Sequence, residues 1–197
     1  MITRAERPVV VGITGASGAP YAVRLLRALN ASGTPVDLIV SAYGFRLLAD
    51  ECGIDGLDGL KEATGDWSRV RVFQTENRGA TPASGSAPTR GMVICPCSMG
   101  TLASIASGTS RNLVERAADV TLKERRPLVL VPRETPFSLI HLENMTRLAR
   151  AGATIMPAAP GFYHRPASID DLVDFIVYRI LDHLDIDVDA PRWSSDR

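Results

Sequence analysis

The chain has 197 residues, 45% of them hydrophobic, and its 22 Lys and Arg residues balance its 22 Asp and Glu residues. This length fits one domain with a sizeable core, and the even charge provides no general attraction to nucleic acid or to a membrane surface. The sequence has neither a membrane-length apolar run nor an apolar signal-peptide core. Cys52, Cys95 and Cys97 lack metal or redox spacing, so we expect a cytoplasmic protein with reduced thiols and no bound metal.

A glycine-rich turn, Gly12–Gly18, follows the apolar run Pro8–Val11 and precedes a predicted helix over Ala19–Asn30. Glycines let the backbone approach a ligand, and the N–H groups of a helix N-terminus favour an anion, so the turn predicts a phosphate site. Its G-x-x-G-x-x-G spacing matches neither the dinucleotide motif nor the P-loop. Taken alone, the turn fits a purely structural role equally well.

The next apolar run, Pro35–Val40, predicts a strand that ends at Ser41. Dinucleotide-binding folds usually carry an Asp or Glu at this point for a ribose hydroxyl. A serine favours a mononucleotide instead, because its hydroxyl can bond to a phosphate or to a flavin edge. A serine that only caps the following helix, expected over Gly44–Glu51, fits the local pattern equally well.

The remaining segments alternate strands with helices. We predict strands at Val70–Phe73, Gly91–Cys95 (broken by Pro96), Pro127–Val131 and Thr154–Met156. We predict helices at Leu102–Ser107, Leu113–Leu122, from Thr135-Pro136 to about Gly152, and at Ser168–Leu184. Loops are predicted at Thr75–Arg90 and Pro157–Pro166, and Gly53–Gly59 is punctuated by glycines. Because most strands are apolar on both faces, the pattern indicates an α/β fold with a three-layer, doubly wound parallel sheet, Rossmann- or flavodoxin-like. We expect one domain over 1–197, with a tail from about residue 185.

Polar groups follow several of the predicted strands, at the edge where ligands bind in such sheets. They are Gly15, Ala16, Ser17, Ser41, Ser98, Met99, Gly100, Thr101 and Arg133. Backbone N–H groups, hydroxyls and a guanidinium suit a phosphate and a ring edge. No G-x-S-x-G elbow of a serine hydrolase is present, and the scattered His141, His164 and His183 lack metal-ligand spacing.

A second set of basic and aromatic residues comes later in the chain: Arg111, Arg116, Lys123, Arg125, Arg126, Tyr163, Arg165 and Arg179. A solvated face is the simpler interpretation of the run from Lys123 to Arg126. Arg179 follows Ile176 on the flank of an apolar helical stripe, where an arginine is more often packed, paired or bound to an anion. Tyr163 fits an aromatic anchor and a core residue equally.

Five motifs occur in order, at Gly12–Ala19, Pro96–Ala103, Arg116–Leu128, Pro132–Pro136 and Phe162–Pro166. Together they closely resemble the flavin prenyltransferase family over about 9–184; the loop 75–87 departs, with Ala87 where an aromatic residue is expected. The resemblance implies an enzyme that joins dimethylallyl phosphate to reduced FMN at N5 and C6 without a metal. The product, prenylated FMN, is the cofactor of a separate decarboxylase, and family members form homo-oligomers, commonly dodecamers, with sites at subunit contacts.

The same resemblance implies roles for individual residues. FMN would be held by Gly15, Ala16, Ser17, Ser41, Ser98, Met99, Gly100, Thr101 and Arg133, and the prenyl phosphate by Tyr163, Arg179, Arg116 and Lys123. Catalytic roles fall to Arg116 and Lys123 at the phosphate, and to Ser17, Glu51 and Glu134 in proton movements. Trp193 would cover the site.

Other functions fit parts of the sequence. The related flavin-dependent cysteine decarboxylases use a histidine base before the middle of the chain, whereas the first histidine here is His141. A direct phenolic-acid decarboxylase subunit is a further alternative, which differs from a flavin prenyltransferase in the partner that receives the product. A non-catalytic FMN carrier leaves Lys123, Glu134, Tyr163 and Arg179 without a shared purpose.

Overall fold

The computed structural model describes residues 3–188 and contains a parallel six-stranded sheet with strand order β3-β2-β1-β4-β5-β6. The strands are β1 (Val9–Ile13), β2 (Val36–Val40), β3 (Val70–Phe73), β4 (Gly91–Cys97), β5 (Leu128–Pro132) and β6 (Thr154–Ile155). The order reverses between β1 and β4, as in doubly wound nucleotide-binding folds. The carboxyl ends of β1 and β4 therefore form the switch point, which is where such folds bind ligands.

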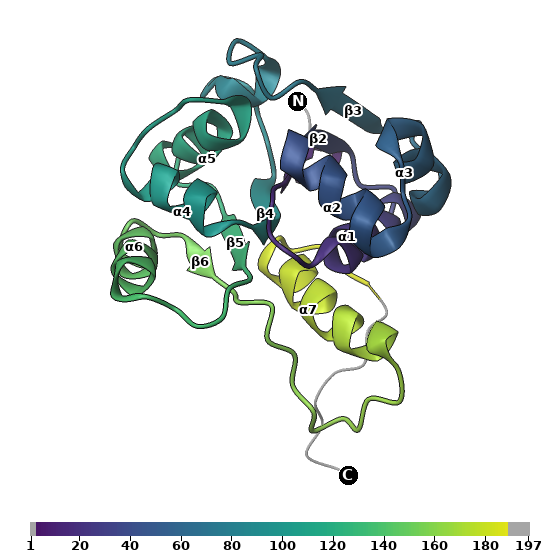
Figure 1. The fold of residues 1–197 in the computed structure, drawn as a ribbon. Coiled ribbons are helices and arrows are strands. Elements are labelled where there is room, and N and C mark those ends of the chain that lie inside the picture. Colours follow the sequence, from purple (N-terminus) through teal and green to yellow (C-terminus); the bar gives the residue numbers. More distant parts are fainter. Residues whose placement is uncertain (1–2, 189–197) are drawn as a thin grey trace.

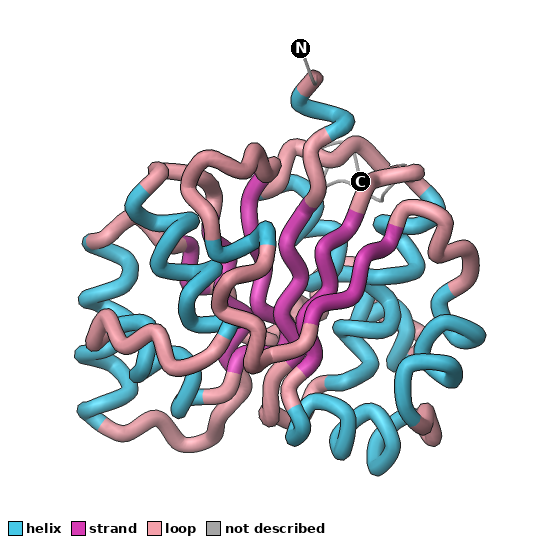
Figure 2. The backbone as a smooth tube through the Cα atoms, turned by 90° about the horizontal axis from the view of Figure 1, so that it is seen from above, coloured by secondary structure: helices cyan, strands magenta, loops and turns pink. Residues whose placement is uncertain are grey.

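Helices cover both faces of the sheet, which confirms the three-layer prediction (Figure 2). One layer contains α1 (Ala19–Ala31), α2 (Ala42–Cys52), α3 (Gly56–Thr64) and α7 (Ile169–His183); the other contains α4 (Met99–Ala106), α5 (Leu113–Lys123) and α6 (Leu139–Arg150). The strands β1, β2 and β5 are buried along their whole length. In β1, Val9 and Val11 pack into one core cluster and Val10 into the other. Continuous apolar strands are thus explained by burial on two faces.

The end of one strand was predicted wrongly, and one helix was missed. β4 does not stop at Pro96 but runs on to Cys97, with a shift of its register against β5 between Ile94 and Cys97. Proline lacks an N–H, which matters least where the ladder is already irregular. The glycine-punctuated segment Gly53–Gly59, where we predicted no helix, includes the start of α3, and Leu60 of this helix is fully buried in the core. Tertiary burial there outweighs the low helix propensity of glycine.

The predicted starts of α6 and α4 were also wrong. α6 begins at Leu139 and not at Thr135-Pro136, which is a cis peptide. Ser138 is the actual N-cap, because its Oγ accepts a hydrogen bond from the backbone N–H of His141. α4 likewise starts at Met99, three residues earlier than predicted, capped by Ser98.

After β6 the chain leaves the sheet as a long loop and returns as α7, which packs against α1 (Figure 1). Arg24 of α1 forms a two-pronged ion pair with Asp174 of α7, with one N–O distance of 2.9 Å. Within residues 3–188, no helix is both long and apolar enough to cross a membrane.

Candidate functional site at the switch point

Two turns meet at the switch point between β1 and β4. Thr14, the first residue after β1, is only 3% exposed. Its Oγ1 donates to the carbonyl of Pro96 (2.9 Å) and accepts from the N–H of Ser98 (2.8 Å). The backbone N–H of Thr14 also donates to the Pro96 carbonyl, at 3.2 Å. The glycine turn and the N-terminus of α4 are therefore joined side by side.

The glycine turn presents Gly15 and Ser17 at the surface. Their N–H groups donate to no other group in the described part of the chain, whereas that of Ala16 donates to the Thr14 carbonyl at 2.9 Å. Gly15 lies tightly against Tyr43: a Cβ at position 15 would come within 2.6 Å of the Tyr43 Cβ. A residue with a side chain at position 15 would therefore displace the turn, and the two available donors would move with it.

The N-terminus of α1 is occupied by a side chain of the protein itself. Oε2 of Glu51, near the end of α2, accepts hydrogen bonds from the N–H groups of Gly18 and Ala19, both at 2.8 Å. The next residue, Pro20, has no N–H. These helix-terminal donors therefore hold Glu51 and do not face an anionic ligand, contrary to the simplest interpretation of the glycine motif.

Two serines at the neighbouring strand ends are helix caps. Oγ of Ser41 accepts from the N–H of Gly44 (3.0 Å), and the Ser41 N–H donates to the Ile13 carbonyl at the end of β1 (2.9 Å). Oγ of Ser98 accepts from the Thr101 N–H at 3.2 Å and donates to the Thr101 Oγ1 at 3.0 Å. Capping uses Ser41 as an acceptor, so its hydroxyl proton is still available to a ligand.

Arg133, directly after β5, reaches the same place. Its Nε donates to the Ser17 carbonyl at 3.1 Å, and the residue is exposed. Within residues 3–188 its two terminal guanidinium nitrogens form no hydrogen bond, so they can bind an anion in the forked geometry that suits phosphate. Glu134 follows, half-buried, and its Oε1 accepts from the N–H of Thr135 at 3.1 Å.

We call this set the switch-point cluster: Gly15, Ala16, Ser17, Ser41, Ser98, Met99, Gly100, Thr101 and Arg133. Three hydrogen bonds connect the segments of this cluster. They join Ser41 to the end of β1, Ser98 to Thr14, and Arg133 to Ser17. It offers N–H donors, hydroxyls and one guanidinium, which is the donor set that an FMN phosphate and flavin edge require. The residues present thus fit a bound FMN.

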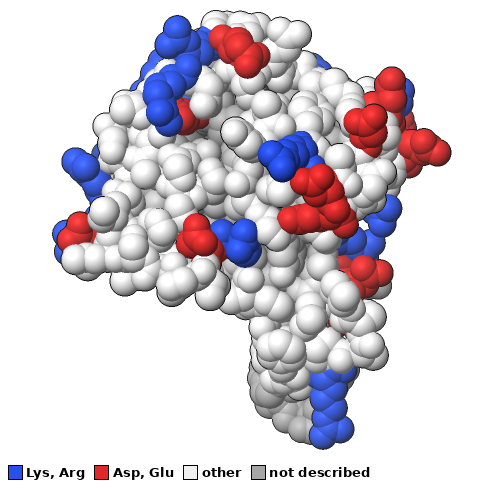
Figure 3. All heavy atoms as spheres, viewed as in Figure 1, with Lys and Arg blue, Asp and Glu red and all other residues white. Residues whose placement is uncertain are grey.

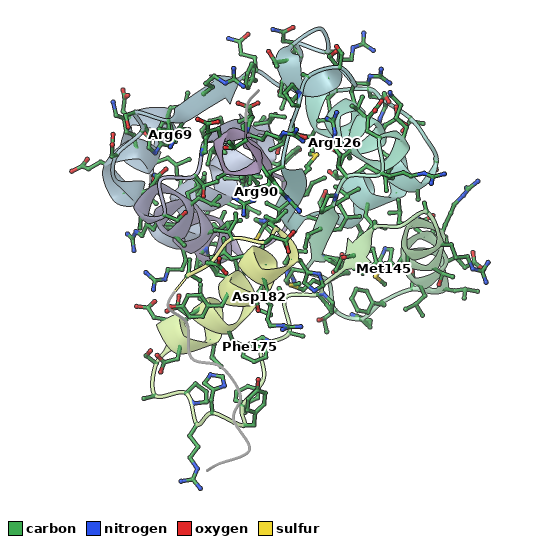
Figure 4. All side chains as sticks on the ribbon, turned by 180° about the vertical axis from the view of Figure 1, so that it is seen from behind. Arg69, Arg90, Arg126, Met145, Phe175 and Asp182 are labelled. Atoms are coloured by element: carbon green, nitrogen blue, oxygen red, sulfur yellow. The ribbon has the colours of Figure 1, made fainter. Side chains whose placement is uncertain are left out.

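The two basic residues on α5 lie at different heights: Arg116 is near the start of the helix, where the Leu113 N–H donates to the carbonyl of Thr75 just past β3, and Lys123 is at its end. Arg116 pairs with Asp119 at 2.7 Å, and Lys123 pairs with Glu124. Lys123 is the last residue of α5, close to the amino end of β5 and to Gly85. Nearby, Arg126 (Figure 4) donates to the carbonyl of Gly85 at 2.6 Å. Lys123 therefore lies at the opposite edge of the sheet from the switch-point cluster.

Tyr163 and Arg179 also lie apart from the cluster. Tyr163 is exposed in the loop before α7, where its ring meets Phe175 edge-on at 5.7 Å. Arg179 pairs with Asp182 at 3.5 Å, near the end of α7 that meets Arg90, and Figure 4 shows Phe175 and Asp182 along this helix. Arg90 directly precedes β4, so this end of α7 is also at the amino edge. Trp193 lies outside the described residues.

Sequence comparisons place the chain among known flavoproteins. A family model described as Flavoprotein matches residues 3–181. The flavin prenyltransferase UbiX of Pseudomonas aeruginosa is 50% identical, over 95% of this chain and 94% of the relative. The chain belongs to the flavin prenyltransferase family.

Solved structures of flavin prenyltransferases and their relatives share the fold. A crystal structure of AnUbiX (PadA1) in complex with FMN and dimethylallyl pyrophosphate has a TM-score of 0.90 and 40% identity, covering 98% of this chain and 100% of that one. A dodecameric FMN-dependent UbiX-like decarboxylase from Escherichia coli O157:H7 has a TM-score of 0.88 and 40% identity, covering 95% of this chain and 100% of that one.

Other groups that could carry chemistry are structural in this flavin prenyltransferase family member. Cys95 and Cys97 are fully buried, and burial raises the pKa of the Cys97 thiol to about 12, which keeps it protonated. Residues 3–188 contain no group of His, Cys, Asp and Glu suited to a metal ion. The face in Figure 3 carries basic and acidic side chains in mixed groups. Sequence reasoning named the turn that contains Thr14 but missed Thr14 itself, whose partners are 82 and 84 positions away.

Proposed function

We propose that this chain is a flavin prenyltransferase that joins dimethylallyl phosphate to reduced FMN at N5 and C6. Prenylated FMN then passes to a separate decarboxylase. The observation that carries the proposal is the near full-length relation to flavin prenyltransferases, combined with a switch-point cluster whose donors suit FMN. The close structural match to a protein with FMN and a dimethylallyl ester bound gives further support.

The switch-point cluster holds the flavin. N–H groups of Gly15 and Ser17 and the guanidinium of Arg133 bind its phosphate, with hydroxyls of Ser41, Ser98 and Thr101 at its polar edges. Met99 and Gly100 complete the start of α4 at this wall, as does Ala16 within the turn. Reduced FMN supplies the electron-rich N5 and C6 atoms. The protein's task there is orientation, since a productive geometry of two substrates lowers the barrier by several kcal/mol.

The leaving phosphate is bound by Arg116, Lys123, Tyr163 and Arg179. Breaking the carbon–oxygen bond of the allylic phosphate concentrates negative charge on the phosphate oxygens, and cations placed there stabilise the transition state. Three cations and a phenol supply this stabilisation without a metal, so we propose a metal-independent reaction. In the single chain Arg116, Lys123 and Arg179 pair with nearby carboxylates, which substrate phosphate would have to compete with or displace.

Because Lys123 and Arg179 lie at the amino edge of the sheet, away from the switch-point cluster in one chain, we propose that neighbouring copies supply these two residues. Large apolar side chains stand on the surface where copies would meet: Leu139 is 70% and Ile140 67% exposed on α6, and Phe162 is 69% and Ile169 76% exposed near α7. Exposed large apolar side chains grouped at two places, on α6 and before α7, fit surfaces that are covered by association. A homo-oligomer, with a dodecamer as its expected form, covers these faces and completes the site.

Proton transfer completes the chemistry. Bonding the isoprenoid chain at N5 and C6 removes one proton from each atom; one of these protons is added to the chain and the other to the released phosphate. Glu51, Ser17 and Glu134 are the groups at the switch point that can relay them. Oε2 of Glu51 is fixed by two backbone N–H groups, so its other oxygen is available for this task.

The proposal is tested by incubating the protein anaerobically with reduced FMN and dimethylallyl phosphate, and then weighing the extracted flavin. A mass raised by one prenyl unit is expected, and dimethylallyl pyrophosphate in a parallel sample identifies the donor. Flavin that is bound but unmodified with either donor would indicate an FMN carrier. Release of CO₂ from a phenolic acid without a second protein would instead indicate a direct decarboxylase.

A further inference from the structure

The geometry points to Thr14 as a positioning residue that sets the spacing between the two halves of the FMN site. This inference rests on the proposed function, because it concerns how the flavin is held. Thr14 itself is not proposed to contact the flavin. It acts through the two segments that its hydroxyl joins.

The position of Thr14 coincides with the end of regular pairing between β1 and β4. That pairing runs from Val9 with Gly91 to Gly12 with Ile94. Past Ile94, β4 changes its register against β5. The Thr14 hydroxyl and N–H therefore hold β1 to β4 where the sheet ladder no longer does.

The hydroxyl cannot be replaced by the surrounding backbone. Among the described residues, the N–H of Ser98 donates to Thr14 Oγ1 and to no other group, and Pro96 has no N–H. Thr14 is only 3% exposed, and the hydrogen bond from its hydroxyl to the Pro96 carbonyl is buried. A buried donor that loses its acceptor carries the full desolvation cost, so without the hydroxyl the two segments move apart until Ser98 is solvated.

Each side of this contact carries part of the FMN site. Gly15 and Ser17 follow Thr14 directly, and Ser98 caps α4, whose first turn includes Gly100 and Thr101. Binding groups on two separate segments recognise one rigid ligand only when their spacing is fixed, and errors of about 1 Å are costly. Loss of the Thr14 hydroxyl therefore weakens FMN binding before it affects any other step.

Three variants test this inference. Thr14→Val keeps the shape and removes the hydroxyl, and Thr14→Ser keeps the hydroxyl and removes the methyl group. Thr121→Val is the matched control, because Thr121 is also 3% exposed but its hydroxyl donates within α5, to the Ala117 carbonyl at 2.7 Å. FMN affinity is measured by quenching of flavin fluorescence, thermal unfolding checks the fold, and turnover gives KM for each substrate.

We expect Thr14→Val to raise the Kd and KM for FMN about tenfold. The KM for dimethylallyl phosphate should not change, and Thr14→Ser and Thr121→Val should bind FMN within about twofold of wild type. Wild-type FMN affinity in folded Thr14→Val, or tenfold weaker binding by Thr14→Ser, overturns the inference. If Thr14→Val does not fold, Thr14→Ala, which also lacks the hydroxyl, replaces it, and wild-type FMN affinity in that variant likewise overturns the inference. A wild-type protein that does not bind FMN contradicts the proposed function itself, and the inference with it.

Discussion

Oε2 of Glu51 lies 2.8 Å from the backbone nitrogen of Ala19, the first residue of α1. The N-terminus of a helix carries partial positive charge, so this contact attracts the Glu51 carboxylate and fixes its orientation. A glycine motif that suggests a phosphate cradle therefore orients a carboxylate beside the switch-point cluster. The contact joins a structural role and a proposed chemical role in one side chain.

Glu51→Gln separates these two roles. We expect turnover to fall at least about 100-fold, since a positioned acid or base contributes that much. Stability should fall by only about 1 kcal/mol, because the amide oxygen can still accept hydrogen bonds. Asp171→Asn is the control, because Asp171 accepts from the N–H of Ala167 (2.7 Å) at the start of α7. It should lose similar stability but keep turnover; Glu51→Gln with turnover within twofold of wild type would refute the proton role.

Arg133→Ala and Lys123→Ala test whether the site is shared between copies. Arg133 lies at the carboxyl edge of the sheet and Lys123 at the amino edge. Each variant alone should be nearly inactive. Oligomers assembled from equal amounts of both variants should recover about a quarter of wild-type turnover. A shared site needs an intact Arg133 from one copy and an intact Lys123 from its neighbour, and each residue is intact in half of the copies. Mixtures that stay inactive would place the complete site within one chain.

Gly15→Ala tests the close approach of the glycine turn to α2. The added methyl would lie 2.6 Å from the Tyr43 Cβ. Overpacking of this kind costs about 1–3 kcal/mol, so the melting temperature should fall. Gly100→Ala is the control, since nothing lies within 4 Å of a Cβ at that position. In a helix the change is neutral or stabilises by up to about 1 kcal/mol. Equal melting temperatures for the two variants would show that the turn can relax.

Arg71→Met tests the ion pair between a buried carboxylate, Asp37, and an arginine that is 56% exposed at the sheet edge. The Asp37 side chain is 0% exposed and accepts two hydrogen bonds from Arg71, at 2.8 and 2.9 Å. Without Arg71, an uncompensated carboxylate is left in the interior, and the free energy of unfolding at neutral pH should fall by about 3 kcal/mol. Arg71→Met/Asp37→Asn should recover much of this loss, because it removes the buried charge.

The stability lost in Arg71→Met, measured as free energy of unfolding, should become smaller at lower pH. Burial raises the pKa of Asp37, and Arg71 acts against this rise. A carboxyl group with a higher pKa in the folded state contributes its stability below the unfolded pKa, and loses it as the pH rises through the folded value. The deficit of Arg71→Met relative to wild type should therefore shrink as the pH falls from about 7 to about 4. Urea unfolding across this range measures it, and a deficit independent of pH would rule out the buried charge as its cause.

The fold was predictable because burial leaves a clear pattern in the sequence. Runs such as Val9–Ile13 and Leu128–Pro132 are apolar on both faces, which indicates parallel strands between two helical layers. Parallel strands place their following residues at one edge, so Ser17, Ser41 and Arg133 could be expected together. Their hydrogen-bond contacts in the structure agree with that placement.

Long-range contacts account for what the sequence did not reveal. Glu51 lies 32 positions from Ala19 and Thr14 lies 84 from Ser98, so no local pattern connects them. α3 was missed because Gly56 and Gly59 weaken its helical pattern, while the burial of Leu60 that offsets them is tertiary. The distance of Lys123 from Ser17 was also unpredictable, since spacing along the chain does not define which edge a surface residue occupies.

The packing of α7 on α1 has a consequence for how the protein is made. α1 leaves the ribosome early, yet the core around Leu25 and Leu26 also contains Ile176 and Ile180 of α7. Until that last helix emerges, the nascent chain keeps one side of its first helix uncovered, together with the unpaired Arg24. This helical layer therefore stays incomplete until α7 has been synthesised, and a chain interrupted before α7 exposes apolar surface that chaperones must shield.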